Sequence, residues 1–174
     1  AYRSDCGEDT PTVMTEAFTA LRDVVLDHNP SATLICDLYT HGQAVWRSGR
    51  FSPPREYIMA WPNDGWGRYA DFPEDTRGYR FGTYMHAGFW LNHVVQDPYP
   101  ERIARSMREL VADHGAGAYC LVNGQTFRHF ILNLEAYAEA CADPDEFDGI
   151  QFALDFARRY AGPTAAPLVV AAQR

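Results

Sequence analysis

Four short apolar runs, each of strand length, recur along the chain. They occupy residues 32–39, 56–61, 80–86 and 118–123. Their apolar residues are nearly continuous instead of alternating with polar ones, which is typical of parallel strands covered on both faces. The pattern therefore predicts an α/β fold built on a parallel sheet.

Three segments carry apolar residues at helical spacing and predict helices over 10–29, 100–115 and 143–162. Proline or glycine stands at or beside each of their ends, as expected for helix boundaries. The residues expected on the three buried stripes are Met14, Ala17, Leu21, Val24 and Val25, then Ile103, Met107, Leu110, Val111 and His114, then Phe147, Ile150, Leu154, Ala157 and Tyr160.

The rest of the chain predicts loops and one further helix. Residues 62–79 have no helical stripe, so we expect a long loop there with a short helix at most. The tail from Thr164 onward predicts the beginning of another helix. We expect one domain over 1–162, followed by the start of a helix or helical domain over 163–174.

Composition excludes several classes of protein. The chain has 174 residues, and all 15 of its basic residues are arginine. Without lysine, Schiff-base chemistry, pyridoxal catalysis and a Walker phosphate loop are excluded. The net charge of −8 argues against a nucleic-acid partner. No apolar run is long enough to span a bilayer, so no membrane partner is expected.

The four cysteines are Cys6, Cys36, Cys120 and Cys141, and they are widely spaced. None forms a CxxC pair, so the spacing gives little support to a zinc site. Cys36 and Cys120 lie inside apolar runs, as small core residues do. Disulfides and the compartment are left open, and a secreted or periplasmic location is compatible with the sequence.

Polar and aromatic side chains gather where the predicted strands end, which is where parallel α/β folds bind their ligands. Aromatic rings stack on sugars, and amides, carboxylates and imidazoles bind hydroxyls. The set therefore suits a carbohydrate substrate, with Asp64 and Asp37 as the pair of catalytic carboxyl groups. The residues expected to bind substrate are Trp61, Asn63, Trp66, Tyr84, His86, Trp90 and Asn123.

Each of these residues also has a structural interpretation. Asp64 lies in an Asn-Asp-Gly sequence, which forms turns in many proteins. Asp37 lies within a predicted strand, where a hydrogen bond to a neighbouring strand would satisfy it. His86 is equally compatible with a hydrogen-bonded core histidine, and Asn123-Gly124 with a turn from strand to helix. Trp61 and Trp66 are equally compatible with core packing.

The order of these motifs resembles the family 115 glycoside hydrolases, the xylan α-1,2-glucuronidases. The resemblance covers roughly residues 15–170 and lies in order and spacing more than in identity. Residues 130–137 stand where the family has its last strand, and residues 156–162 resemble the start of the helical region after it. The residues that carry the resemblance are Trp61, Asp64, Trp66, Gly67, Gly82, Tyr84, His86, Val122 and Asn123.

The resemblance implies that this chain is the C-terminal half of a (β/α)8 TIM-like barrel. It also implies an inverting hydrolase with a carboxylate acid and base and no cofactor. Asp64 would be a family-type carboxylate, with His86 and Asn123 lining the sugar pocket. The expected partners are the carbohydrate substrate and the remainder of the barrel with its helical domain, and a homodimer is left open.

The chain departs from the family pattern at three places. Asn63 stands where the family has an aspartate, and residues 87–90 replace a Gly-Gly-Pro-Arg segment whose arginine suits a uronate carboxylate. Gln125-Thr126 stands near a further family aspartate. These departures point to altered sugar specificity.

Two other interpretations stay open beside a glycoside hydrolase. The first is a carbohydrate-binding barrel that has lost its acid–base pair, which the replacement at Asn63 supports. The second is a metal-dependent hydrolase that uses His41, Asp37, Asp64 and His86, although their spacing carries no metal-ligand signature.

Overall fold

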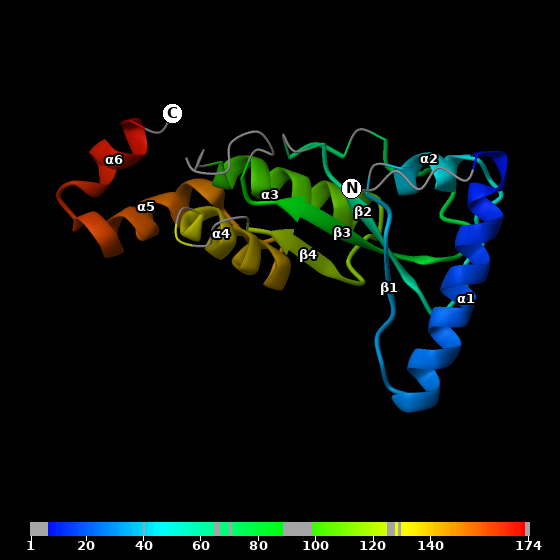
Figure 1. The fold of residues 1–174 in the computed structure, drawn as a ribbon. Helices are drawn as coiled ribbons and strands as arrows, with labels where there is room; N and C mark the ends of the chain where they lie inside the picture. Colours follow the sequence, from blue (N-terminus) through cyan, green and yellow to red (C-terminus); the bar gives the residue numbers. More distant parts are fainter. Residues whose placement is uncertain are drawn as a thin grey trace.

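Four parallel strands form one curled sheet in the order β1-β2-β3-β4 (Figure 1). This computed structural model describes residues 7–39, 41–64, 67–69, 71–88, 99–124, 128 and 130–172. The strands are β1 Ile35–Asp37, β2 Ile58–Pro62, β3 Arg80–His86 and β4 Cys120–Asn123. All four apolar runs therefore form strands, and the prediction of a parallel α/β fold is confirmed.

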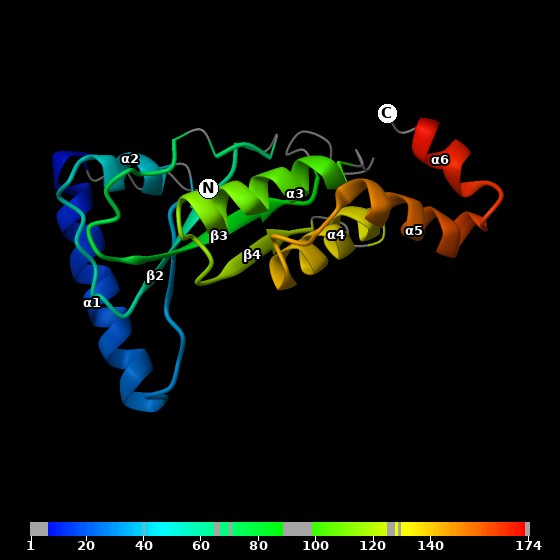
Figure 2. The ribbon, with the colours of Figure 1, turned by 180° about the vertical axis from the view of Figure 1, so that it is seen from behind.

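Helices connect and follow the strands. They are the 3₁₀ turn η1 Gly7–Asp9, α1 Thr10–His28, α2 His41–Arg47, α3 Pro100–Arg108 with the π-helical turn η2 Glu109–Asp113, α4 Ile131–Ala142, α5 Gly149–Ala161 and α6 Ala166–Ala172. Figure 2, seen from behind, shows α1 at one end of the molecule and α5 and α6 at the other. None of the described helices is both long and apolar enough to cross a bilayer.

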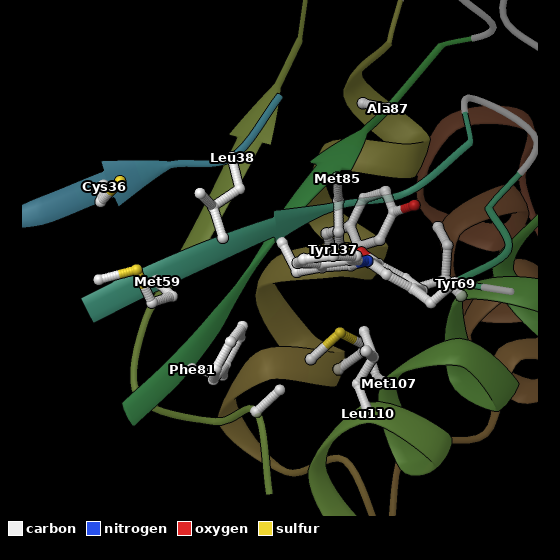
Figure 3. Close-up of a cluster of buried hydrophobic side chains, with 14 of the residues drawn as sticks. Cys36, Leu38, Met59, Tyr69, Phe81, Met85, Ala87, Met107, Leu110 and Tyr137 are labelled. Atoms are coloured by element: carbon white, nitrogen blue, oxygen red, sulfur yellow. The ribbon is translucent and has the colours of Figure 1, made fainter. Parts of the chain in front are cut away.

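The strand register separates the two faces of the sheet. Side chains alternate between faces along a strand, so residues aligned across parallel strands share a face. Cys36, Met59 and Phe81 are aligned on one face. Figure 3 shows this face packed against α3 and α4, with Phe81 and Met85 on the side of Met107, Leu110 and Tyr137. Burial of these apolar side chains is the main stabilising contribution to the fold.

The opposite face is lined by polar groups toward the strand ends. Asp37 is aligned with Ala60 and Gly82, and His86 with Asn123. Gly82 is required here because a Cβ atom at this position would lie 2.3 Å from the Tyr119 carbonyl oxygen. Gly82, which is one of the residues that carry the family resemblance, thus allows β3 and the segment entering β4 to approach closely.

Helix α1 forms where predicted, but of its expected buried stripe only Met14 packs against the core, and the rest of the stripe is wrong. Leu21 and Val24 are 56% and 61% exposed. Beside Met14, the helix packs through Phe18 and Leu26, and the Phe18 ring makes edge contacts with Phe51 and Tyr57. Both stripes are apolar, and the Phe18 side is the one that meets the domain.

Within residues 130–137, all but the N-cap residue Phe130 lie in helix α4, which corrects the strand that the family resemblance implied. Alanine, leucine and glutamate dominate α4, and these residues favour helices. The helix buries Leu132, Asn133, Ala136, Tyr137 and Ala140 at helical spacing.

Three further features differ from expectation: the start of α5, its buried stripe and the presence of α2. Helix α5 begins at Gly149 instead of residue 143, because the Asp148 carboxylate caps it by accepting from the N–H groups of Ile150 and Gln151. Of its expected stripe, Ile150 and Tyr160 are 41% and 65% exposed. Helix α2 was not expected, because it spans only 7 residues. The helix predicted over 100–115 and the tail helix are both confirmed.

Candidate functional site

Three rings form a cluster at the carboxyl end of the sheet. The ring centroids of Tyr84 and His86 are 4.9 Å apart, and Tyr39 lies 5.5 Å from Tyr84 and 5.9 Å from His86. Tyr84 and His86 share a face because they are two residues apart on β3, whereas Tyr39 lies in the turn that follows β1. Aromatic faces in such a cluster can stack on a sugar ring.

Asn123 extends this cluster from β4. Its Nδ2 group donates to the Tyr84 hydroxyl oxygen over 3.0 Å. Two of the residues expected to bind substrate are therefore in direct contact, and the amide fixes the direction of the tyrosine hydroxyl.

His86 is buried, with 3% of its surface exposed, and is held in one tautomer. Its Nδ1 atom lies 2.6 Å from Asn63 Oδ1, so Nδ1 carries the proton that the amide oxygen accepts. The neutral ring then offers Nε2 as an acceptor. Burial lowers the pKa of His86 below its ordinary value, and the nearby Asp64 carboxylate opposes this in part.

The backbone around His86 is fixed by polar side chains from two neighbouring elements. The hydroxyls of Tyr99 and Tyr137 both donate to the His86 carbonyl oxygen. Asn133 of α4, which is fully buried, donates Nδ2 to the Ala87 carbonyl oxygen over 2.7 Å. Helix α4 therefore holds the end of β3, where the candidate site lies.

The two carboxyl groups expected to be catalytic have different surroundings. Asp37 accepts from the Tyr39 N–H group over 3.0 Å. Partial burial raises the pKa of the Asp37 carboxyl, and the hydrogen bond from Tyr39 partly opposes this rise. Asp64 forms an ion pair with Arg68, whose Nε atom lies 2.7 Å from Asp64 Oδ2, and also accepts from the Arg68 backbone N–H.

A pocket of about 870 Å³ opens beside this cluster, between β1, α2 and the start of α1. Asp37, Tyr39, Tyr84 and Asn123 line it together with His41 and Arg50. Asp37 is thus the expected catalytic carboxyl that lines this pocket, together with two of the expected substrate-binding residues. The volume is in the range of small-molecule sites.

Of the expected tryptophans, Trp61 does not join the cluster. Trp61 lies on the face of the sheet that the helices cover, is 1% exposed and packs against Phe72 and Phe81. Trp66 and Trp90 lie outside the described residues. The structure therefore gives Trp61 a place in the core, in agreement with its structural interpretation.

Among the described residues, the arrangement has no multi-ligand metal centre. Across the part of the chain that the structure describes, no three His, Cys, Asp or Glu side chains are grouped closely enough to hold a metal ion. The donor geometry thus gives no support to the metal-dependent interpretation.

Several residues of the site were missed in the sequence. Tyr39 could have been found, because it closely follows the carboxyl end of β1, where parallel α/β folds bind their ligands. Arg68, the ion-pair partner of Asp64, follows it by four residues in a loop and carries no such signal. Tyr99, Asn133 and Tyr137 act on His86 and Ala87 from separate elements, and only the tertiary fold reveals this.

The fold and the site together define a class: an α/β domain with a polar, aromatic-lined pocket at the carboxyl ends of its parallel strands. The family model of glycosyl hydrolase family 115 matches residues 5–172, and the chain belongs to this family. The resemblance stated from the motifs is thereby confirmed, and the family is one of glycoside hydrolases. A comparison with curated proteins gives no match.

Proposed function

We propose that this chain supplies part of the active site of a glycoside hydrolase that cleaves a glycosidic bond of a polysaccharide or its side chains. One observation carries the proposal. In a family 115 chain, the carboxyl ends of the strands bring Asp37, Tyr39, Tyr84, His86 and Asn123 to one face beside a pocket.

Asp37 is the proposed general acid. A general acid must hold a proton at the working pH, and burial raises the pKa of this carboxyl. Asp64 is the proposed second carboxylate, which activates or positions the attacking water. In an inverting enzyme the two carboxyl groups stand about 6.5–9.5 Å apart, with room for that water.

The remaining polar groups hold the sugar. In the proposed complex His86 Nε2 accepts from one sugar hydroxyl, because its other nitrogen is occupied by Asn63. Tyr84 and Asn123 bind a second hydroxyl, and the exposed ring of Tyr39 stacks on the sugar.

The proposed substrate is a uronic acid glycoside, in the manner of an α-glucuronidase. Residues 87–90 lack the arginine of the family segment, but Arg50 lines the pocket. A guanidinium binds a carboxylate through two parallel hydrogen bonds. Arg50 is held there by donating to the Glu8 carbonyl oxygen.

Further strands complete the sheet in this proposal. Among the described residues, β1 and β4 each pair on one side only, which leaves two sheet edges. Closure into a (β/α)8 barrel removes such edges and places the candidate site inside its carboxyl-end rim.

The test is hydrolysis of a uronic-acid-bearing xylooligosaccharide by the protein that carries this chain. The proposal predicts release of the free uronic acid, first as the inverted anomer in ¹H NMR spectra. Asp64→Asn should lower kcat by about 10²-fold or more. An Asp64→Asn protein that hydrolyses at the wild-type rate would refute the role of Asp64.

A second candidate function is carbohydrate binding without turnover. Asn63 replaces a family carboxylate and is bound to His86, and Asp64 is engaged by Arg68. Calorimetric binding of the same oligosaccharide, with no product after prolonged incubation, would favour this function over hydrolysis.

A further inference from the structure

Two cysteines from different elements lie close together at the β4 edge of the sheet. Cys120 is the first residue of β4, and Cys141 lies in the last turn of α4. Their sulfur atoms are 2.8 Å apart. A disulfide bond measures about 2.05 Å, so the two sulfurs need to move together by less than about 1 Å to bond.

Both thiols are within reach of small reagents, because both side chains are only half-buried. Cys36 differs from this pair in its burial, its position in the sheet and its pKa. It is fully buried on β1, at the opposite edge of the sheet, and burial raises its pKa to about 12. Cys36 is therefore an internal comparison for the reactivity of the pair.

The pair also has the chemistry of an exchanging dithiol. A hydrogen bond joins the two sulfurs, in which either thiol can be the donor, and with Cys141 as the donor it lowers the pKa of Cys120. The thiolate is the form that attacks a disulfide, so Cys120 is the attacking residue and Cys141 the resolving one.

We propose that Cys120 and Cys141 form a reversible disulfide that links β4 to the end of α4. The co-reactant is a low-molecular-weight disulfide. The Cys120 thiolate bonds to one of its sulfurs and releases the first small thiolate. Cys141, as it gives up its proton, then bonds to Cys120 Sγ and releases the second. Two protein thiols are oxidised, and one small disulfide is reduced to two thiols.

The bond would close a loop whose residues contact the candidate site and support it. The two cysteines are 21 positions apart, and the enclosed segment contains Asn123, Asn133 and Tyr137. Asn123 contacts Tyr84, and the other two residues donate to the backbone at His86 and Ala87. The proposed bond thus anchors the helix that supports the end of β3.

Peptide mapping tests the bond directly, because trypsin places each cysteine on its own peptide. Cys6 falls in 4–22, Cys36 in 23–47, Cys120 in 109–128 and Cys141 in 129–158. The protein is equilibrated with oxidised and reduced glutathione, quenched with acid, alkylated in denaturant and digested. We expect one cross-linked species, 109–128 joined to 129–158, that disappears on reduction.

Thermal unfolding provides the second measurement. Closing a loop of this length should raise Tm in oxidising buffer by about 5–10 °C for a chain of this size. Cys120→Ser and Cys141→Ser should each abolish this rise, whereas the control Cys36→Ala should keep it. Full alkylation of both peptides after oxidation, or a redox-dependent Tm that persists in Cys120→Ser, would overturn the proposal.

Discussion

Asn133→Ala should destabilise the chain strongly, because Asn133 joins three elements from a fully buried position. It donates to the Ala87 carbonyl oxygen at the end of β3 over 2.7 Å and accepts from the Tyr99 N–H before α3 over 3.3 Å. Alanine can make neither bond. The variant therefore leaves a carbonyl and an N–H group in the interior without these partners.

The magnitude follows from those two bonds. A typical hydrogen bond contributes about 1 kcal/mol net, and a buried group left without its partner costs about 1–3 kcal/mol. The 3.3 Å bond is the weaker of the two, so the expected loss in the free energy of unfolding is about 2–4 kcal/mol. Urea unfolding followed by tryptophan fluorescence measures this loss, with equal m-values as the check on two-state behaviour.

Glu139→Ala is the matched control, because Glu139 is an exposed residue of the same helix. Its expected effect is within about 0.5 kcal/mol of wild type. The His86 imidazole NMR signals should shift in Asn133→Ala and stay in place in Glu139→Ala. An Asn133→Ala protein as stable as the control would refute the claim that α4 holds the end of β3.

Three further predictions concern packing, pH and a helix cap. Gly82→Ala should lower the free energy of unfolding in urea by about 2–3 kcal/mol, because its Cβ atom would collide with the Tyr119 backbone. An unchanged urea midpoint would contradict this close approach. Burial lowers the pKa of His86, so between that value and about 6.5 only the unfolded chain binds the proton. The free energy of unfolding should thus rise with pH through this window, and His86→Gln should flatten the rise; equal slopes would exclude His86 as the cause. Asp148→Ala should lower the free energy of unfolding by about 1 kcal/mol, because it removes the cap of α5. Thermal unfolding measures this loss, with the exposed Asp145→Ala as the control.

The strands could be predicted from the sequence because parallel strands need apolar residues on both faces. That requirement produces continuous runs that stand out from the rest of the chain. Helix α3 was equally clear, with Ile103, Met107 and Leu110 buried as expected. The face of α1 could not be predicted, because Leu21 and Phe18 both lie on apolar stripes and only the position of the helix against Phe51 and Tyr57 decides between them.

The candidate site was predictable only in part. The ends of parallel strands meet at one edge, so the grouping of Tyr84, His86 and Asn123 followed from chain order. Which face each side chain occupies depends on register, and the register places Trp61 in the core. Contacts between distant segments, such as that of Asn133 with Ala87, leave no local pattern in the sequence.

Asp37 and its pocket are proposed as the catalytic site of a glycoside hydrolase. The most direct measurement is kcat/KM for release of uronic acid from a substituted xylooligosaccharide by the wild type, Asp37→Asn and the exposed control Asp145→Asn. We expect a loss of about 10²–10⁴-fold in kcat/KM for Asp37→Asn and wild-type activity for the control. Equal kcat/KM values for Asp37→Asn and wild type would contradict it.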